Sequence, residues 1–189
     1  MLAGFRVYVS KNTILENKNS SETGTGEMLR LYKNDAKNFS LHYPVDYSVD
    51  EAYEYQAFGP GKNIVGVKFT IPPSVTTGTN LSSDSYISVE MLPEVQACRA
   101  GLFLSNGHAT EKEIIDQGLS YSVASSTGAG AGNRYEETVY ALRGTRPCFA
   151  VRYFVHYGAI ENYPSGTVQQ FDKQALLKEF DAIRRTLVI

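Results

Sequence analysis

The glycine-rich stretch Ser126–Tyr135 (STGAGAGNRY) contains residue types that could bind a phosphate. Three glycines at alternate positions followed by an arginine form a phosphate-binding loop only where they lead into a helix, whose first turn supplies oriented backbone amides. Here the glycines lead into Asn133–Tyr140, which has strand character and an acidic pair near its start. We therefore predict a mobile connection between two strands at Gly128–Gly132, and we expect no anion bound there.

The two cysteines, Cys98 and Cys148, each lie in an apolar setting. Two interpretations remain open: a pair of buried reduced thiols, or a disulfide that joins the segment around Cys98 to a core strand. In the loop-entropy description, a bridge over a loop of this length stabilises the fold by about 4 kcal/mol. A disulfide requires an oxidising compartment, so the prediction of an exported location depends on this pair.

The three histidines, His42, His108 and His156, are scattered along the chain. None has a second histidine, cysteine or carboxylate at the spacing of a zinc site. Cys148 and His156 lie on one expected strand about 26 Å apart at the usual rise per residue, which is too far for a nucleophile and its base. The sequence therefore assigns no catalytic residue, and we expect no metal and no cofactor.

Five titratable residues on the expected strands could line a polar groove if their strands are neighbours and these faces are aligned. The interpretation that we favour is a solvated or salt-bridged face of a sheet. The five residues are Glu90, Arg134, Glu136, Arg152 and His156.

Alternation of apolar and polar residues predicts that strands dominate, mostly as a meander. We expect a short helix within Pro93–Leu104 and an amphipathic helix over Asp172–Arg185, with Asp172 as its amino-terminal cap. Pro72–Asp84 has the composition of a long loop. Strands are expected in Met28–Tyr32, Phe39–Pro44, Tyr53–Phe58, Asn63–Ile71, Ser85–Leu92, Glu113–Gln117, Leu119–Ser125, Asn133–Arg143 and Pro147–Tyr157.

The length of 189 residues favours one domain, and a formal net charge of −2 argues against the basic surface that gathers nucleic acid. Ser10–Glu27 is nearly all polar and predicts a flexible linker. The apolar run Met1–Val9 is either a first edge strand or the trailing end of a membrane span. We therefore divide the chain into an N-terminal stub and linker (1–27) and a single α+β domain (28–189).

Several short motifs carry a resemblance to known proteins. They are Asn38–Pro44 (NFSLHYP), Gly132–Glu136 (GNRYE), Pro147–Val151 (PCFAV), Asn162–Gly166 (NYPSG) and Phe171-Asp172 before the last helix. The chain resembles uncharacterised bacterial envelope proteins, which often carry a lipoprotein signal or a membrane span, and more distantly the PsbP-like proteins. The resemblance implies an antiparallel sheet of about 6–8 strands with a C-terminal helix packed on it, in an α/β/α sandwich. Because few helices are visible before residue 93, one helical layer is expected to be thin or missing.

The same resemblance implies a non-catalytic binding or assembly module. We expect an exported, periplasmic or otherwise extracytoplasmic protein of the bacterial cell envelope, tethered to the membrane in its full-length form. The expected partner is another envelope protein, with no nucleic acid. Two alternatives remain: a hydrolase whose site is assembled from separate strands, and a small-ligand or lipid carrier suggested by the aromatic content.

Overall fold

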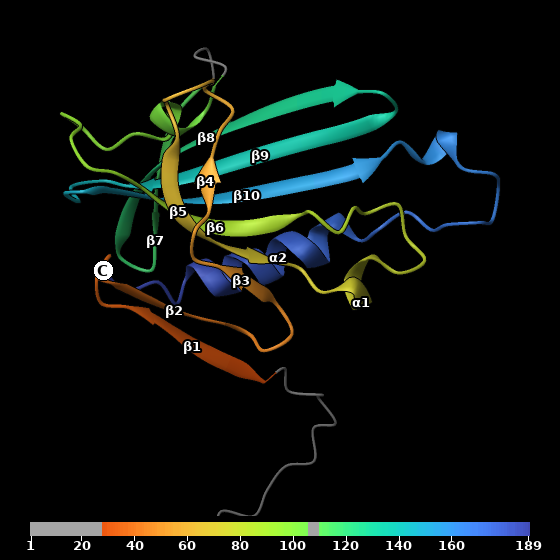
Figure 1. Ribbon diagram of the computed structural model, residues 1–189, viewed down its shortest axis with the longest axis horizontal. Coiled ribbons are helices and arrows are strands. Elements are labelled where there is room, and N and C mark those ends of the chain that lie inside the picture. Colours follow the sequence, from red (N-terminus) through yellow and green to blue (C-terminus); the bar gives the residue numbers. More distant parts are fainter. Residues whose placement is uncertain (1–27, 106–109) are drawn as a thin grey trace, which may run out of the picture.

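The computed structural model describes residues 28–105 and 110–189 (Figure 1). The apolar run Met1–Val9, the linker Ser10–Glu27 and His108 lie outside the described residues. Within the described ranges, no helix is both long and apolar enough to cross a membrane.

The centre of the fold is an eight-stranded antiparallel sheet. Its strands follow the order β3-β5-β6-β10-β9-β8-β7, and β4 pairs with β5 beside that path. The last four strands form a meander, as predicted, and β8, β9 and β10 extend well beyond the others (Figure 1). The bounds are β3 Ser48–Asp50, β4 Glu54–Tyr55, β5 Ile64–Thr70, β6 Tyr86–Leu92, β7 Lys112–Asp116, β8 Leu119–Gly130, β9 Asn133–Leu142 and β10 Cys148–Gly158. Each predicted range overlaps a strand, β8 runs five residues beyond its predicted end, and β3 was not predicted.

One face of this sheet packs against a helix and a hairpin. The helix α2 (Lys173–Arg184) lies beside the two-stranded sheet of β1 (Leu29–Asn34) and β2 (Phe39–Pro44). Asp172 caps α2 as predicted, because its carboxylate accepts the backbone N–H of Ala175 at 2.9 Å. The helix buries a stripe of apolar side chains against the sheet, and a fold with this sheet and this C-terminal helix is α+β, as the sequence predicts. The buried apolar residues of the stripe are Leu176, Phe180 and Ile183.

The opposite face carries a thin layer instead of a second α-helix. The predicted helix within Pro93–Leu104 is wrong: residues 93–99 are irregular, and only one 3-10 turn, η1 (Ala100–Phe103), follows. The reason is tertiary, because Cys98 is held against the start of β10 and the backbone N–H of Ala100 donates to Ser122 Oγ at 3.0 Å. Buried residues of this layer and of the sheet form a second hydrophobic core.

The predicted loop Pro72–Asp84 contains the short helix α1 (Pro73–Thr76) and is tied down at its centre. The side chain of Asn80 is buried, donates to the carbonyl of Gly158 at 2.7 Å and accepts the N–H of Phe171 at 2.9 Å. One amide group therefore joins this loop to the end of β10 and to the entrance of α2.

The glycine-rich stretch is part of a hairpin and not a loop. Gly128 pairs with Tyr135 and Gly130 pairs with Asn133, so the strands continue to a two-residue turn at Ala131-Gly132. Both turn residues have positive φ, 49° and 80°, which matches the right-handed twist of the flanking strands. The prediction that the glycines lead into a strand and connect two strands is confirmed, but the connection is shorter than predicted, because Gly128 and Gly130 belong to β8. The mobility of this segment stays a prediction.

Candidate functional site

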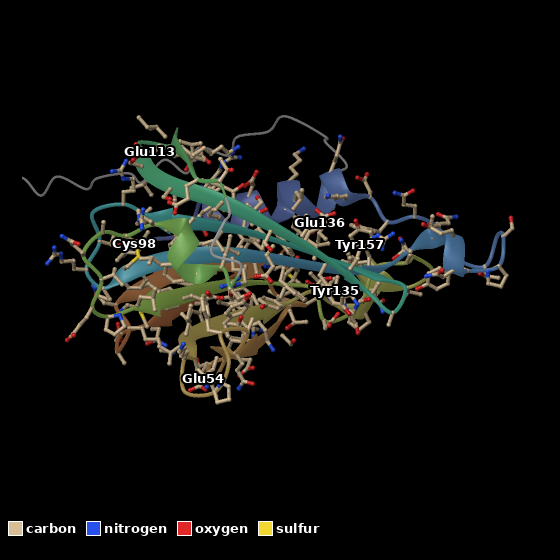
Figure 2. All side chains as sticks on the ribbon, turned by 90° about the horizontal axis from the view of Figure 1, so that it is seen from above. Glu54, Cys98, Glu113, Tyr135, Glu136 and Tyr157 are labelled. Atoms are coloured by element: carbon tan, nitrogen blue, oxygen red, sulfur yellow. A yellow bond between two sulfur atoms is a disulfide. The ribbon has the colours of Figure 1, made fainter. Side chains whose placement is uncertain are left out.

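The five polar residues that the sequence singles out do not line one groove, because they lie on two faces of the sheet. Glu136 lies on the α2 face, where it pairs with Lys173 and accepts the hydroxyl of Tyr157 at 2.7 Å. Figure 2 shows Glu136 and Tyr157 on the helix side and Tyr135 on the other. Arg134 lies two residues from Glu136 on β9 and shares its face. The other three, Glu90, Arg152 and His156, belong to the η1 face.

Arg152 and Glu90 form an ion pair with no exposed surface on either side chain. Two parallel hydrogen bonds of 2.7 and 2.8 Å join the guanidinium to the carboxylate. The same guanidinium donates to the carbonyl of Phe103 in η1 at 2.6 Å and to the carboxylate of Glu137. This bidentate, charge-assisted geometry satisfies the buried charges and connects β6, β9 and β10 to the η1 layer.

Tyrosines enclose this buried cluster. The ring centroid of Tyr55 lies 3.5 Å from Arg152 Cζ, and the Tyr55 hydroxyl donates to Glu137 at 2.9 Å. Burial raises the pKa of Tyr55 to about 12, with Arg152 opposing the rise. Burial also raises the pKa of Tyr53, whose hydroxyl donates to Glu90 at 3.2 Å. The phenols stay protonated donors at neutral pH, so this cluster holds chain segments together.

His156 forms a pair with Asp84. Its Nδ1 lies 2.8 and 2.9 Å from the two carboxylate oxygens, and its ring stacks on Tyr135 with centroids 4.4 Å apart. The hydroxyl of the neighbouring Ser85 is engaged with the backbone of His156, donating to its carbonyl and accepting its N–H. Asp84 therefore orients the imidazole of His156, and the Ser85 hydroxyl is bonded to backbone atoms and not to that ring. His42 lies on β2, and the described residues contain no group of three or more His, Cys, Asp or Glu side chains arranged to hold a metal ion.

Cys98 and Cys148 form a disulfide, which is one of the two alternatives that the sequence leaves open. The sulfurs are 1.99 Å apart and the Cα atoms 5.1 Å apart. Both residues are buried, and Cys148 is the first residue of β10. The bridge therefore holds the irregular segment 93–99 against the start of a core strand.

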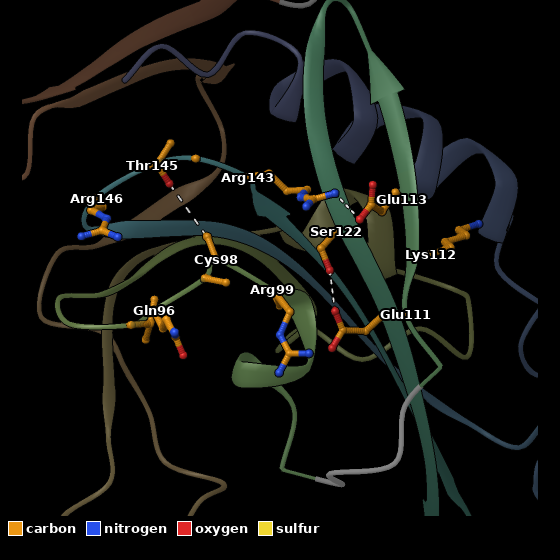
Figure 3. Close-up of a pocket in the computed structure, with 13 residues that line it drawn as sticks. Gln96, Cys98, Arg99, Glu111, Lys112, Glu113, Ser122, Arg143, Thr145 and Arg146 are labelled. Carbon is orange, nitrogen blue, oxygen red and sulfur yellow. Dashed lines mark hydrogen bonds and ion pairs between the residues drawn. The ribbon is translucent and has the colours of Figure 1, made fainter.

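A cavity of about 640 Å³ lies beside this disulfide (Figure 3). Its walls come from four chain segments: residues 95–99, residues 111–113 at the start of β7, Ser122 on β8, and residues 143–146 in the turn between β9 and β10. Ser122 is buried and accepts the N–H of Ala100 while donating to Glu111 at 2.7 Å. The lining of the cavity is thus held in place by the hydrogen bonds of Ser122 and by the Cys98–Cys148 disulfide.

The charged lining of the cavity is mainly cationic. Four basic and two acidic side chains contribute, in a chain whose formal net charge is −2. Glu113 pairs with Arg143, whereas Glu111 accepts the Ser122 hydroxyl and keeps its negative charge, so the lining carries two more positive than negative charges. Among the residues that the structure describes, the remaining cations make no ion pair. These are Arg99, Lys112 and Arg146.

Sequence reasoning misses this cavity because its walls come from four separate segments between Val95 and Arg146. Cys98 is the only wall residue with a local signal, and its disulfide is what brings the first segment against the sheet. Nothing in the sequence alone relates Arg99 to Arg146.

The fold and the site define an α+β domain with a disulfide-braced, basic cavity on one face of an antiparallel sheet. No protein-family model and no curated protein matches the chain. Among solved structures, a crystal structure from Bacteroides thetaiotaomicron is 17% identical, with a TM-score of 0.44, over 79% of this chain and 44% of that protein. The solution structure of cyanobacterial PsbP from Synechocystis sp. is 13% identical, with a TM-score of 0.44, over 90% of this chain and 98% of that protein.

These likenesses include a PsbP protein, the kind of protein that the sequence resembles. The chain spans less than half the length of the Bacteroides protein. At TM-scores below 0.5 neither similarity carries an argument about function. What the site does is therefore argued from the chain's own residues.

Proposed function

We propose that this chain is an exported, non-catalytic binding module of the bacterial cell envelope. The observation that carries the proposal is the disulfide beside the basic cavity. Cys98 and Cys148 are 50 residues apart in the sequence, and their bond fixes a wall of the cavity. Disulfides form and persist in the periplasm and at cell surfaces and are rare in a reducing cytosol.

A binding role is supported by how the titratable groups are used. Arg152 and Glu90 satisfy one another inside the core, and the Ser85 hydroxyl is engaged with backbone atoms of His156. These groups hold segments of the fold in place. The cavity, in contrast, presents three cations that form no ion pair within the described part of the chain, and such groups suit recognition.

The partner that we propose is another protein of the envelope. The motif resemblance supports such a partner. It also supports a membrane tether on the N-terminal side of the domain in the full-length protein. A fixed, polar cavity supports a partner of defined shape, because a preformed site avoids the entropic cost of ordering its own walls on binding.

Thiol trapping in the native host tests the exported location. The full-length gene product is acid-quenched, labelled with a polyethylene-glycol maleimide with and without prior reduction, and located by cell fractionation. We expect the envelope fraction, no label before reduction and two labels afterwards. A Cys98→Ser variant should show one label without reduction. Two free thiols in a cytosolic protein would overturn the export of this chain.

A substrate panel tests the non-catalytic part. We expect no turnover of esterase, phosphatase or glycosidase substrates by the purified chain. Turnover that an alanine substitution at Asp84 or His156 abolishes, with an unchanged melting temperature, would favour the hydrolase alternative instead.

A further inference from the structure

The three cations of the basic cavity that form no ion pair among the described residues come from different parts of its lining. Figure 3 shows Lys112 and Arg146 on opposite sides of the cavity, with Cys98, Arg99 and Ser122 between them. A single small anion such as inorganic phosphate is held best where several donors converge on one point. Cations set apart on different segments instead match a ligand that carries several separate negative charges.

A second, more apolar hollow of about 440 Å³ adjoins this cavity. It is lined by Val95, Leu102 and three residues of the segment between them, and it shares every lining residue except Leu102 with the larger cavity. The segment 95–99 therefore forms a ridge with a basic hollow on one side and an apolar hollow on the other. Because Cys98 within this ridge is bonded to β10, the ridge is fixed before any ligand arrives.

From this arrangement we infer that the two hollows bind an extended acidic segment of the partner protein. Carboxylates of that segment lie against Arg99, Lys112 and Arg146, and an apolar side chain next to them fills the hollow beside Val95 and Leu102. An arginine guanidinium suits a carboxylate because its planar donors match the two oxygens. This inference rests on the proposed function, because it requires that the partner is a protein.

Titration of the 15N-labelled chain with synthetic peptides, followed by NMR, tests the occupant. The first probe is a ten-residue peptide of alternating Glu and Leu. A second replaces every Glu by Gln, a third replaces every Leu by Ser, and a ten-nucleotide oligo-dT carries negative charge of another chemical class. We expect the first probe to shift amides of residues 95–102, 112 and 143–146. The Gln peptide and oligo-dT should bind at least about tenfold more weakly, and the Ser peptide should bind with intermediate affinity.

Two charge-matched variants locate the effect. Arg99→Gln with Arg146→Gln removes two cations from the rim and should weaken the Glu-Leu peptide by roughly tenfold, as expected for two exposed charge contacts. Arg30→Gln with Arg134→Gln removes the same charge from exposed positions on β1 and β9 and should leave the affinity within about twofold. Unchanged 15N spectra away from the substitutions establish that both variants are folded.

Several outcomes would overturn the inference that the two hollows bind an acidic segment. They are no shifts at millimolar peptide, shifts centred away from the two hollows, equal affinity for the Glu and Gln peptides, binding of oligo-dT as tight as that of the Glu-Leu peptide, or equal weakening in both variants. None of these outcomes affects the thiol-trapping result, so the experiments can contradict the acidic segment and still support the exported location.

Discussion

At the scale of single residues, Arg152 joins three buried parts of the chain through its guanidinium group. It binds Glu90, Glu137 and the Phe103 carbonyl, and it has no exposed surface. Replacing one member of a buried ion pair leaves the other charge without compensation, which typically costs about 3–5 kcal/mol. We therefore expect Arg152→Met to lower the free energy of unfolding by about that amount, as measured by urea denaturation.

Neutralising the partner should reverse part of this loss. Glu90→Gln added to Arg152→Met removes the uncompensated carboxylate, so the double variant should be more stable than Arg152→Met alone. Arg30→Met, at an exposed position on β1, is the control and should change the stability by less than about 0.5 kcal/mol. A double variant no more stable than Arg152→Met would show that Glu90 does not depend on this arginine.

At the scale of elements, the β8–β9 hairpin depends on one of its glycines. Gly132 has a φ of 80°, and a Cβ added there would lie 2.5 Å from Asn162 Nδ2, whereas a Cβ on Gly130 would meet nothing within 4 Å. We expect Gly132→Ala to destabilise the fold by about 1–2 kcal/mol, the cost of a left-handed non-glycine residue. Gly130→Ala should be neutral in the same thermal unfolding experiment, and equal effects would contradict the hairpin geometry.

The packing of α2 against β7 should depend on acid pH. A hydrogen bond from Arg184 lowers the pKa of the Asp116 carboxyl below its usual value, and Arg185 acts in the same direction. A carboxyl whose pKa is lower in the folded state stabilises the fold above its unfolded pKa of about 4, and the stabilisation is lost as pH falls through the folded pKa. Asp116→Asn should therefore cost about 1–2 kcal/mol at pH 7 and progressively less below pH 4.

The control for this pH series is Asp46→Asn, at an exposed position between β2 and β3. Its urea midpoint should follow that of the unsubstituted protein at every pH. A difference between Asp116→Asn and the unsubstituted protein that persisted unchanged to pH 2 would exclude the ion pair with Arg184 as its cause.

At the scale of the whole molecule, the sheet separates two hydrophobic cores, and only one of them is cross-linked. Replacing both cysteines by serine should lower the free energy of unfolding by about 4 kcal/mol in the loop-entropy description. The loosening should also be local. In hydrogen exchange under native conditions, amides of residues 93–104 should exchange faster through local opening. Amides of α2 should exchange faster only as far as the loss of global stability requires. Faster local exchange in α2 as well would show that the two cores are not independent.

The sequence predicts those parts of the fold whose pattern is local. The strands and α2 are visible because side chains recur at periods of two and 3.6, and Asp172 marks the start of the helix by its own chemistry. The helix predicted within Pro93–Leu104 is wrong because the conformation of this segment is decided by contacts with Cys148 and Ser122, which are distant in the sequence. The basic cavity could not be predicted for the same reason, since Arg99, Lys112 and Arg146 come together only after the sheet has formed.

The buried phenols provide an optical signal of the state of the fold. The chain has 13 tyrosines and no tryptophan, and burial raises the pKa of Tyr53, Tyr86 and Tyr153 above the value of an exposed phenol. Groups of this kind keep their protons as long as the chain is folded, so they stabilise the fold fully below about pH 10 and lose that contribution as the pH rises above it. Exposed tyrosines should ionise gradually in an alkaline titration, and the buried ones should ionise together when the sheet opens. The near-ultraviolet absorbance of tyrosinate therefore measures alkaline unfolding without any added label.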